Sequence, residues 1–320
     1  VPFAIWRGRQ LLAENRIDAI LTTGPPHSTH LAGAALQWMT DVPWVADFRD
    51  PWTNINYYEE LPHTQWARRI DAALERLVLR RAHAVTTVSP TWRNILADKA
   101  ALSPDKYQVI QNGFDDADLP LTQQEVDTDA FVLTHVGSLY ASRNPTGLWQ
   151  ALQRLRENGA VPALRLRFVG TVDPNVRRAL RAHGLEEIAE FISYVPHEEA
   201  VAYMQRAGLL LLSIEPFSAS AGMLTGKIYE YLAAGRPIVG VGDADGDAAA
   251  LLRKTKGGAL FARDDVEGLA ALIQQHYAAW AEGMPCTGAS PEVLRPYRRK
   301  VQAGEMAGVL DNVAVSQPSS

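Results

Sequence analysis

Residues 225–241 read TGKIYEYLAAGRPIVGV, and this stretch indicates the fold class of the chain. A Gly226-Lys227 pair opens a predicted helix, Ala-Ala-Gly-Arg-Pro closes it, and the apolar run 238–241 follows as a buried strand. The free N–H groups of a helix N-terminus suit phosphate, and Lys227 adds a positive charge there. Glu230, on the next turn, can accept hydrogen bonds from sugar or ribose hydroxyls. These features are typical of half of a nucleotide-sugar site, although a capped surface helix with an exposed Lys and Glu is an equal alternative.

The same alternation of buried strands and helices runs along the whole chain. Strands are predicted at residues 17–23, 42–48, 84–89, 107–111, 131–137, 164–170, 190–195, 208–214 and 237–242. Segments with helical spacing lie between them, as at 66–81, 145–156 and 174–183. This pattern predicts an α/β fold of parallel sheets with right-handed crossovers.

An acidic, aperiodic stretch at residues 115–129, with Pro120, interrupts this rhythm and is predicted to be a linker. Two Rossmann-like domains are therefore expected, at residues 1–118 and 130–290. Residues 291–312 are predicted to form two short helices, of which the helix at 300–313 packs back on the first domain, and 316–320 a frayed tail. Four strands precede the linker where about six are usual, so the first domain is predicted to be incomplete at its N-terminus. The start at Val1, without Met, fits a fragment.

Composition narrows the class of protein. Of the 320 residues, 47% are hydrophobic and 21% charged, which is typical of a globular protein. The net charge of −5 argues against general nucleic-acid binding. Cys286 is the single cysteine, which excludes an intrachain disulfide and fits a cytoplasmic protein. No apolar run approaches the roughly 20 residues that span a bilayer.

A second cationic loop follows the strand that ends at Gly137. Gly137 would let the backbone approach a phosphate, Arg143 supplies charge, and Pro145 is suited to the first position of a helix. Loops at the carboxyl ends of parallel strands are where α/β folds bind ligands. The alternative is an ordinary turn with an exposed Arg. Because Lys227 provides a second cation in the same half of the chain, this alternative is less favoured.

The first half of the chain has two loops of similar character. Residues 22–30 contain a tight turn and His27, which is predicted to line a site, whereas His30 is expected in packing or at the surface. Residues 46–53 place Arg49 and Asp50 after a strand, where they either pair with each other or line a cleft. Both interpretations stay open.

Other signals favour ordinary structure. Asp243 and Asp245 have the spacing of a metal-binding pair but lie in a Gly/Asp-rich loop that suits turns and caps, so no metal is expected. One helix carries several arginines, which usually form a solvated face and alternatively bind a membrane surface or an anionic acceptor. These are Arg68, Arg69, Arg76, Arg80 and Arg81.

In this order, the segments resemble a glycosyltransferase with two Rossmann-like domains (the GT-B fold), of the large retaining family 4, or group 1. The resemblance covers essentially the whole chain and is strongest over residues 134–262, with support from 22–30, 46–53, 86–89, 109–115 and 168–170. The runs PPHSTH at 25–30 and DFRDPW at 47–52 resemble bacterial members that build surface polysaccharides.

The resemblance implies roles for particular residues. The donor diphosphate would meet Gly137, Ser138, Arg143, Gly226 and Lys227, and Glu230 would bind ribose or donor-sugar hydroxyls. Arg143, Lys227 and Glu230 would form the catalytic set, with His27, Arg49 and Asp50 on the acceptor side. Four departures stand against the family pattern. Gly222 replaces the earlier of two glutamates, for which nearby Glu215 could substitute at a different spacing. Ser138 replaces a common Arg, the family histidine falls near Gly24, and the family's Gly-rich loop after the first strand would lie before Val1.

The expected function is transfer of a sugar from a nucleotide-diphospho-sugar to a hydroxyl acceptor with retention of configuration, without a metal or other cofactor. The expected acceptor is a glycan or lipid-linked molecule of bacterial polysaccharide or lipopolysaccharide assembly. The expected location is the cytoplasm, with peripheral association with the inner membrane. A nucleotide-sugar epimerase of the same fold and a non-catalytic nucleotide-sugar-binding module remain as alternatives.

Overall fold

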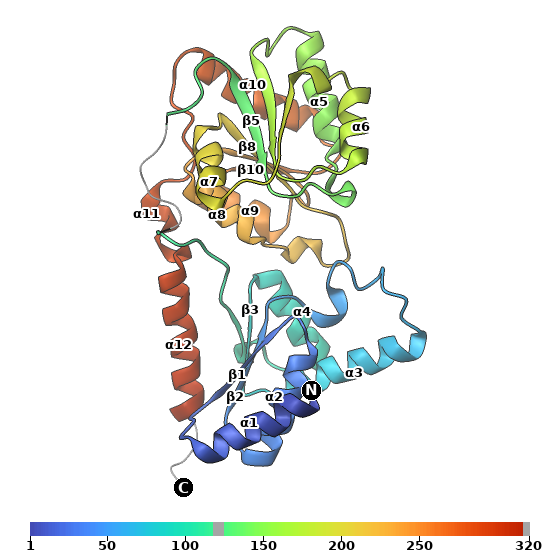
Figure 1. Cartoon of the computed structure of the whole chain (residues 1–320), viewed down its shortest axis with the longest axis vertical. Coiled ribbons are helices and arrows are strands. Elements are labelled where there is room, and N and C mark those ends of the chain that lie inside the picture. The colour runs from blue at the N-terminus through green and yellow to red at the C-terminus, as the bar shows by residue number, and fades with distance from the viewer. Residues whose placement is uncertain (118–124, 316–320) are drawn as a thin grey trace. The chain divides into compact units, whose positions relative to one another are not determined.

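The computed structural model describes residues 1–117 and 125–315 of the chain (Figure 1). The chain divides into two α/β units, each with its own parallel sheet, so the predicted fold class is confirmed. The first unit contains residues 1–112 and the C-terminal segment from residue 300, and the second contains residues 113–299. None of the helices in the described part of the chain has the length and apolar character that a membrane crossing requires.

The first unit is built on a four-stranded parallel sheet in the order β1-β2-β3-β4. Its strands are β1 (Ile20–Gly24), β2 (Trp44–Phe48), β3 (Ala84–Thr87) and β4 (Tyr107–Val109). Its helices are α1 (Pro2–Glu14), α2 (Ser28–Thr40), α3 (Gln65–Arg81), α4 (Pro90–Ala100) and α12 (Arg299–Val315), with short 3₁₀ turns at Trp52–Asn54 and Pro104–Lys106. Strands that follow one another in the sequence are neighbours in the sheet, as right-handed crossovers in one direction require.

Helices cover both faces of this sheet. Successive side chains of a strand point to opposite faces, and β2 illustrates this. Trp44 and Phe48 are buried in a cluster with α2, α3 and α4, whereas Val45 packs with Val309 and Val313 of α12. The last helix of the chain therefore completes the core of the first unit.

The second unit has a six-stranded parallel sheet in the order β10-β9-β8-β5-β6-β7. Its strands are β5 (Phe131–Val136), β6 (Leu164–Val169), β7 (Ala189–Ile192), β8 (Leu209–Ser213), β9 (Ile238–Val241) and β10 (Gly258–Phe261). Its helices are α5 (Thr146–Glu157), α6 (Pro174–Ala182), α7 (His197–Arg206), α8 (Gly226–Ala233), α9 (Asp247–Thr255), α10 (Val266–Ala281) and α11 (Pro291–Leu294), with 3₁₀ turns at Ala141–Arg143, Glu186–Ile188, Ser220–Gly222 and Arg295–Tyr297. Two apolar clusters fill the spaces on either side of the sheet.

Each of the nine predicted strands overlaps an observed one. The sequence did not indicate β10, because its four residues, GALF, begin with glycine and include no β-branched residue. The prediction of two short helices over 291–312 was also wrong in length, since α12 extends over 17 residues.

The predicted linker is partly built into the second unit. Residues 118–124 lie outside the described residues, as does the predicted tail at 316–320. On one side of that gap, Phe114 donates its N–H to the carbonyl of Tyr297 (3.1 Å) and accepts from the N–H of Arg299 (2.9 Å). On the other side, Val126 packs against the core, and the N–H of Asp127 donates to the carbonyl of Arg206 (3.1 Å).

Candidate functional site

The strand order of the second unit marks one place for a ligand. Counted along the sequence, the six strands lie in the order 3-2-1-4-5-6, so the direction of winding reverses between β5 and β8. Ligands of such sheets bind outside the carboxyl ends of the strands at this reversal. The loop at 137–145 follows β5, and the loop at 214–225 follows β8 and leads into α8.

Gly137, directly after β5, has a backbone that favours glycine. Its φ of +101° lies in the left-handed region, and a Cβ atom there would stand 2.9 Å from Nζ of Lys227. Gly170 follows the neighbouring strand with φ of +119°, and a Cβ atom on it would stand 2.8 Å from the carbonyl oxygen of Gly137. Two glycines thus let the strand ends and the Lys227 ammonium approach closely.

Lys227 lies in the first turn of α8 and is held over a buried histidine. His135 of β5 donates its Nδ1–H to the carbonyl of Leu211 (3.0 Å), so Nε2 is the acceptor that faces Nζ of Lys227 at 3.4 Å. Burial and the Lys227 charge lower the pKa of His135 to about 3, and the ring is therefore neutral. Burial and, secondarily, the charge of Arg143 lower the pKa of Lys227 to about 8, while Glu230 opposes this shift.

The N-terminus of α8 is open toward solvent. Thr225 is the N-cap residue, but its side chain caps no N–H group of the helix. Gly226 is exposed, and a Cβ atom on it would meet nothing within 4 Å. The first-turn amides and the Lys227 ammonium therefore form a positive helix end with room for an anion.

The Arg143 side chain is held by the carboxylate of Glu215, which lies in the loop after the neighbouring strand β8. Its Nη2 lies 3.2 Å from Oε1 of Glu215, and the Ser142 hydroxyl donates to Oε2 of Glu215 (2.8 Å). Glu215 is buried after β8, and its carboxylate faces the 137–145 loop. The sequence offered Glu215 as a substitute for the family glutamate missing at Gly222, whereas here Glu215 joins the two loops.

Arg263, just after β10, is a further residue of this region that sequence reasoning missed. Its guanidinium donates to the carbonyls of Ile214 (2.7 Å), Ser142 (3.1 Å) and Asn144 (3.2 Å). It thus links the loop after β5 to the loop after β8. Recognition of β10 in the sequence would have marked Arg263 as another strand-end cation.

The predicted donor residues lie on two adjoining segments of the second unit, the loop at 137–145 and helix α8. The charges of Arg143 and Glu230 both act on Lys227, whose Nζ faces Gly137. Glu230 is half-buried, and among the described residues its carboxylate has no hydrogen-bond partner. Ser138 is half-buried next to Gly137. Lys227 and Glu230 are half-buried rather than fully exposed, and their role in a ligand site stays a prediction.

The acceptor-side residues meet at the carboxyl ends of β1 and β2 in the first unit. His27 donates from Nε2 to the backbone carbonyl of Asp50 (2.8 Å) and stacks on Trp52 with ring centroids 5.6 Å apart. Arg49 donates to the side-chain oxygen of Asn112, so the proposed alternative of Arg–Asp pairing is not the arrangement found. His30 is buried, with Nδ1 2.9 Å from the Thr22 hydroxyl, as the packing interpretation expects.

Burial shifts both titratable groups of this set. It lowers the pKa of His27, although the Asp50 carbonyl and carboxylate oppose the shift, and the imidazole is held in its neutral form. It raises the pKa of the Asp50 carboxyl, although His27 and Arg49 oppose that shift.

A buried ion pair supports this loop and was not predicted. Glu75 of α3 is 1% exposed and pairs with Nζ of Lys99 at 2.7 Å, and the Thr53 hydroxyl also donates to it (2.6 Å). The sequence pattern indicated the arginines of α3 but did not indicate the inward-facing carboxylate of Glu75. The pair anchors the turn that follows Asp50.

Two family models match the chain, one for each unit. Residues 2–113 match the Glycosyl transferase 4-like domain, and residues 130–279 match Glycosyl transferases group 1. The chain belongs to the group 1 glycosyltransferases. The segment with Gly137, Lys227 and Glu230 lies within the group 1 match. A search of curated proteins finds no significant match.

Solved structures share the fold of this glycosyltransferase along nearly its whole length. Sucrose-phosphate synthase from Thermosynechococcus elongatus has a TM-score of 0.71 at 18% identity, over 99% of this chain and 78% of the other. The lipopolysaccharide outer core galactosyltransferase WaaB scores 0.66 at 12% identity, over 97% and 79%. Anabaena HepE, solved with UDP and glucose, scores 0.63 at 19% identity, over 96% and 80%. At these identities the similarity establishes the GT-B fold.

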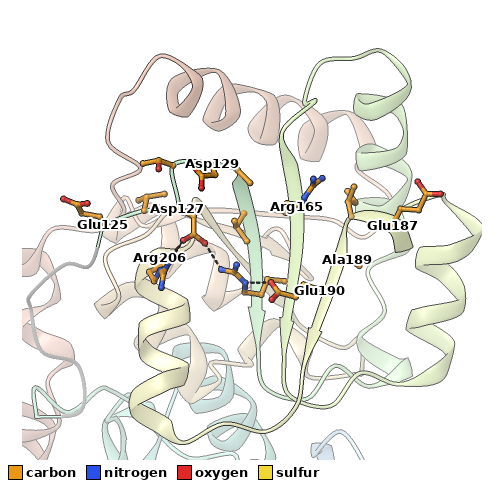
Figure 2. Close-up of a pocket in the computed structure, with 14 residues that line it drawn as sticks. Glu125, Asp127, Asp129, Arg165, Glu187, Ala189, Glu190 and Arg206 are labelled. Atoms are coloured by element: carbon orange, nitrogen blue, oxygen red, sulfur yellow. Dashed lines mark hydrogen bonds and ion pairs between the residues drawn. The ribbon is translucent and has the colours of Figure 1, made fainter.

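The glycosyltransferase also has a large cavity away from the β5–β8 reversal. It has a volume of about 940 Å³ and lies at the amino ends of β5, β6 and β7 (Figure 2). In Figure 2, Asp127 points toward Arg206 to the left of these strands, and Arg165 and Glu187 lie to the right of Asp127. The amino ends of parallel strands are not where this sheet type binds ligands.

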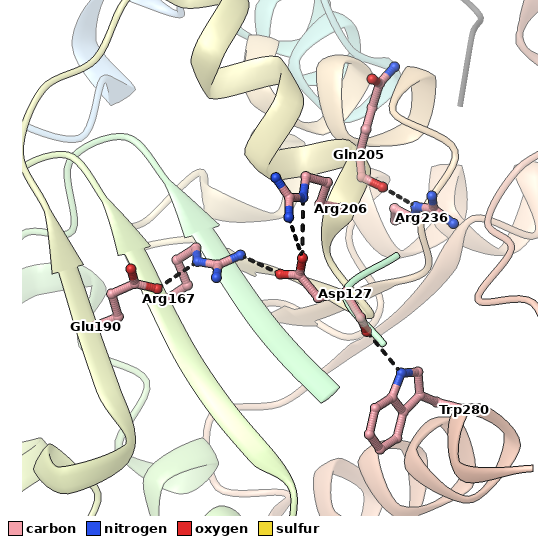
Figure 3. A network of polar contacts seen from close by, with 7 residues as sticks. All are labelled: Asp127, Arg167, Glu190, Gln205, Arg206, Arg236 and Trp280. Atoms are coloured by element: carbon pink, nitrogen blue, oxygen red, sulfur yellow. Dashed lines mark hydrogen bonds and ion pairs between the residues drawn. The ribbon is translucent and has the colours of Figure 1, made fainter. Parts of the chain in front are cut away.

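A polar network fills part of that cavity wall (Figure 3). Asp127 accepts from Arg167 (2.8 Å) and Arg206 (3.0 Å), and Arg167 also donates to Glu190 (2.8 Å). The indole N–H of Trp280 donates to the carbonyl of Asp127 (3.2 Å). The carboxylates already neutralise Arg167 and Arg206, so the network has a structural role in holding the end of the linker on the sheet edge.

Over residues 1–117 and 125–315, no group of three or more His, Cys, Asp or Glu side chains could hold a metal ion. The Asp243 carboxylate instead accepts from the backbone N–H of Asp245 (3.1 Å). This is the turn geometry that the sequence favours for the 242–247 loop.

Proposed function

We propose that this glycosyltransferase moves a sugar from a nucleotide-diphospho-sugar donor to a hydroxyl acceptor, with retention of configuration. The observation that carries the proposal is the Lys227 ammonium, which stands beside Gly137 at the open N-terminus of α8, where the strand order reverses. Fixed cations and helix-end amides that converge on one point suit the charge of a diphosphate.

The proposed chemistry follows from the charge of the leaving group. As the bond to the sugar breaks, negative charge builds on the nucleoside diphosphate oxygens. Lys227, Arg143 and the amide of Gly226 would stabilise that charge without a metal ion. Because Glu215 already neutralises part of the Arg143 charge, Lys227 is the strongest uncompensated cation of the set.

We assign the hydroxyls of the ribose or donor sugar to Glu230. Its carboxylate lies one helical turn after Gly226, close enough to Lys227 to raise the pKa of that ammonium. An ionised carboxylate can accept from two adjacent hydroxyls at once. Gly137 and Ser138 complete the proposed donor site with backbone that can lie against the diphosphate.

The acceptor is assigned to His27, Arg49 and Asp50 of the first unit. Since Nε2 of His27 carries the proton given to the Asp50 carbonyl, Nδ1 is the ring atom that can accept from an acceptor hydroxyl. Arg49 and Asp50 add one charge of each sign at the same strand ends.

The proposed biological role is bacterial polysaccharide or lipopolysaccharide assembly on a glycan or lipid-linked acceptor. The enzyme would work in the cytoplasm, peripherally at the inner membrane. The sequence runs at residues 25–30 and 47–52 support this role, because they resemble those of bacterial members that build surface polysaccharides.

The direct test is nucleotide-induced thermal stabilisation with UDP, GDP, ADP and TDP, each with and without EDTA. One nucleotide should stabilise the protein by about 2.7 kcal/mol at one hundred times its dissociation constant. Lys227→Ala and Arg143→Ala should lose that stabilisation. Lys254→Ala, which removes an exposed lysine of the same unit, should keep it.

The outcomes separate the alternatives. Stabilisation that survives EDTA and vanishes in the Lys227 variant supports a metal-free donor site. Transfer of sugar to an added acceptor then identifies a transferase, interconversion of sugar isomers an epimerase, and binding without turnover a binding module. Stabilisation that persists in Lys227→Ala would refute the assigned site.

A further inference from the structure

The outer face of α3 carries an exposed apolar stripe. Trp66, Ile70, Ala73 and Leu77 follow one another at steps of four, three and four residues, which places them on one line along a helix. All four are exposed, and Trp66, Ile70 and Leu77 are 73%, 53% and 42% accessible. We call these four residues the α3 stripe.

The α3 stripe is distinct from the face that holds α3 on the sheet. That packing face consists of Glu75, Val78 and Leu79, all buried. At roughly 100° per residue, it lies on the side of the helix opposite to the stripe. Figure 1 shows the first turns of α3 extending away from the sheet of this unit. Contiguous apolar surface of this kind marks an interaction site.

Arginines border the α3 stripe, while the acidic residues of the helix turn inward. At roughly 100° per residue, Arg69, Arg76 and Arg80 run along one edge of the stripe and Arg81 along the other. Asp71 accepts from the Tyr58 hydroxyl (2.8 Å), and the buried Glu75 pairs with Lys99. The exposed acids closest to α3 in the sequence, Glu59 and Glu60, belong to the preceding loop.

The apolar surface continues onto the neighbouring helix. Leu77 and Arg81 share a groove of about 260 Å³ with residues of α2, among them Leu31 and Trp38. Trp38 is 69% exposed. Two exposed tryptophans beside arginines have the composition of a surface that lies at a membrane–water interface, where indole rings and long basic side chains are both favoured.

We propose that the α3 stripe docks this protein on an anionic lipid bilayer. The stripe would enter the boundary between headgroups and acyl chains, and the flanking arginines would pair with lipid phosphates. A second copy of the chain fits less well, because a symmetric contact would place the arginine edges of both stripes against each other. The inference deepens the peripheral membrane location proposed above, and it does not depend on glycosyl transfer.

The test is co-sedimentation of the full chain with vesicles of phosphatidylcholine alone and of phosphatidylcholine with phosphatidylglycerol. The chain should sediment with the anionic vesicles and dissociate from them at high salt. Trp66→Ser/Ile70→Ser should abolish binding, whereas the matched control Tyr194→Ser/Val293→Ser, on exposed apolar residues of the second unit, should not. Arg69→Gln/Arg76→Gln should weaken binding by roughly five-fold for each arginine removed, unlike Arg178→Gln/Lys254→Gln.

Each variant is also compared with the wild type by differential scanning calorimetry, in which the first unit should melt as it does in the wild type. An unchanged first-unit transition with lost vesicle binding supports the proposal and excludes misfolding, whether or not a nucleotide binds the second unit. The proposal is overturned if the wild type ignores anionic vesicles, or if stripe and control variants bind alike. It is equally overturned if the wild type forms a dimer that the stripe variant abolishes, since the stripe is then a contact between copies.

Discussion

Lys227 has to satisfy two opposing conditions, because it is partly buried beside Arg143 and must still carry a charge when a ligand arrives. Its neutral neighbour His135 offers an acceptor without adding positive charge. Burial has therefore brought the pKa of Lys227 close to physiological pH, and an entering anion would shift it back up.

This gives an expected pH profile for nucleotide binding. A bound diphosphate raises the pKa of Lys227 above its free value of about 8, so affinity is fully present below pH 8. Above pH 8 the free protein loses the Lys227 proton first, and affinity falls until the pKa of the complex is reached. Calorimetric titration on both sides of pH 8 measures this profile. A flat profile in the wild type would contradict the role of Lys227, and Lys254→Ala should show the wild-type fall.

A pair of substitutions at His135 separates its two hydrogen bonds. Gln can reproduce the acceptor at Nε2 that faces Lys227, whereas Asn can reproduce the donor to Leu211. Both should lower stability because the site is fully buried. We expect Asn to bind nucleotide about ten-fold more weakly than Gln, since a hydrogen bond to a charged group is worth roughly 1.5–3 kcal/mol. Equal affinities, measured well below the unfolding temperature, would make His135 a packing residue.

The residues of this site differ in how visible their roles are in the sequence. Gly137, Arg143, Lys227 and Glu230 stand at strand ends or a helix start, where a sequence pattern can point to them. His135 lies inside an apolar strand and therefore resembles a core residue. Glu215 meets Ser142 across 73 positions of sequence, and no local pattern encodes that contact.

Among the elements, α12 has a testable energetic role. Val309→Ala should lower the free energy of unfolding of the first unit by about 1–3 kcal/mol, because it removes buried methyl groups from the face opposite α2–α4. Val301→Ala on the same helix is the control, since Val301 is 38% exposed. Differential scanning calorimetry should show the first unit melting earlier and the second unit unchanged. Equal effects of the two substitutions would contradict the packing described.

The helices and strands also differ in how well the hydrophobic pattern of the sequence predicts them. Nine strands follow from apolar, β-branched-rich runs of the kind that parallel sheets favour. The tenth, β10, lies at one edge of its sheet, begins with glycine and has no β-branched residue, so it leaves no comparable signal. For the outward side of α3, the sequence indicated only the arginines. It did not indicate the apolar residues there, because their exposure depends on how the helix packs on the sheet.

At the scale of the whole molecule, the proposed donor site at Lys227 and the cavity of Figure 2 are two candidate places for the donor, and one variant distinguishes them. Asp127→Asn should destabilise the second unit by about 1–3 kcal/mol, because it weakens two partly buried ion pairs. Nucleotide affinity should stay within about two-fold of wild type, as expected for sites that share no partners. Isothermal titration of the folded variant measures this. Loss of binding would move the donor to the cavity of Figure 2.

The position of α12 also bears on how the chain is made. During synthesis the four strands of the first unit emerge long before residues 309 and 313. Until those residues follow, Val45, Ala84 and Ile110 lack the helix that covers them. The second unit is one uninterrupted segment and can close its sheet as soon as it is complete. The unit that leaves the ribosome first is therefore the last to finish folding.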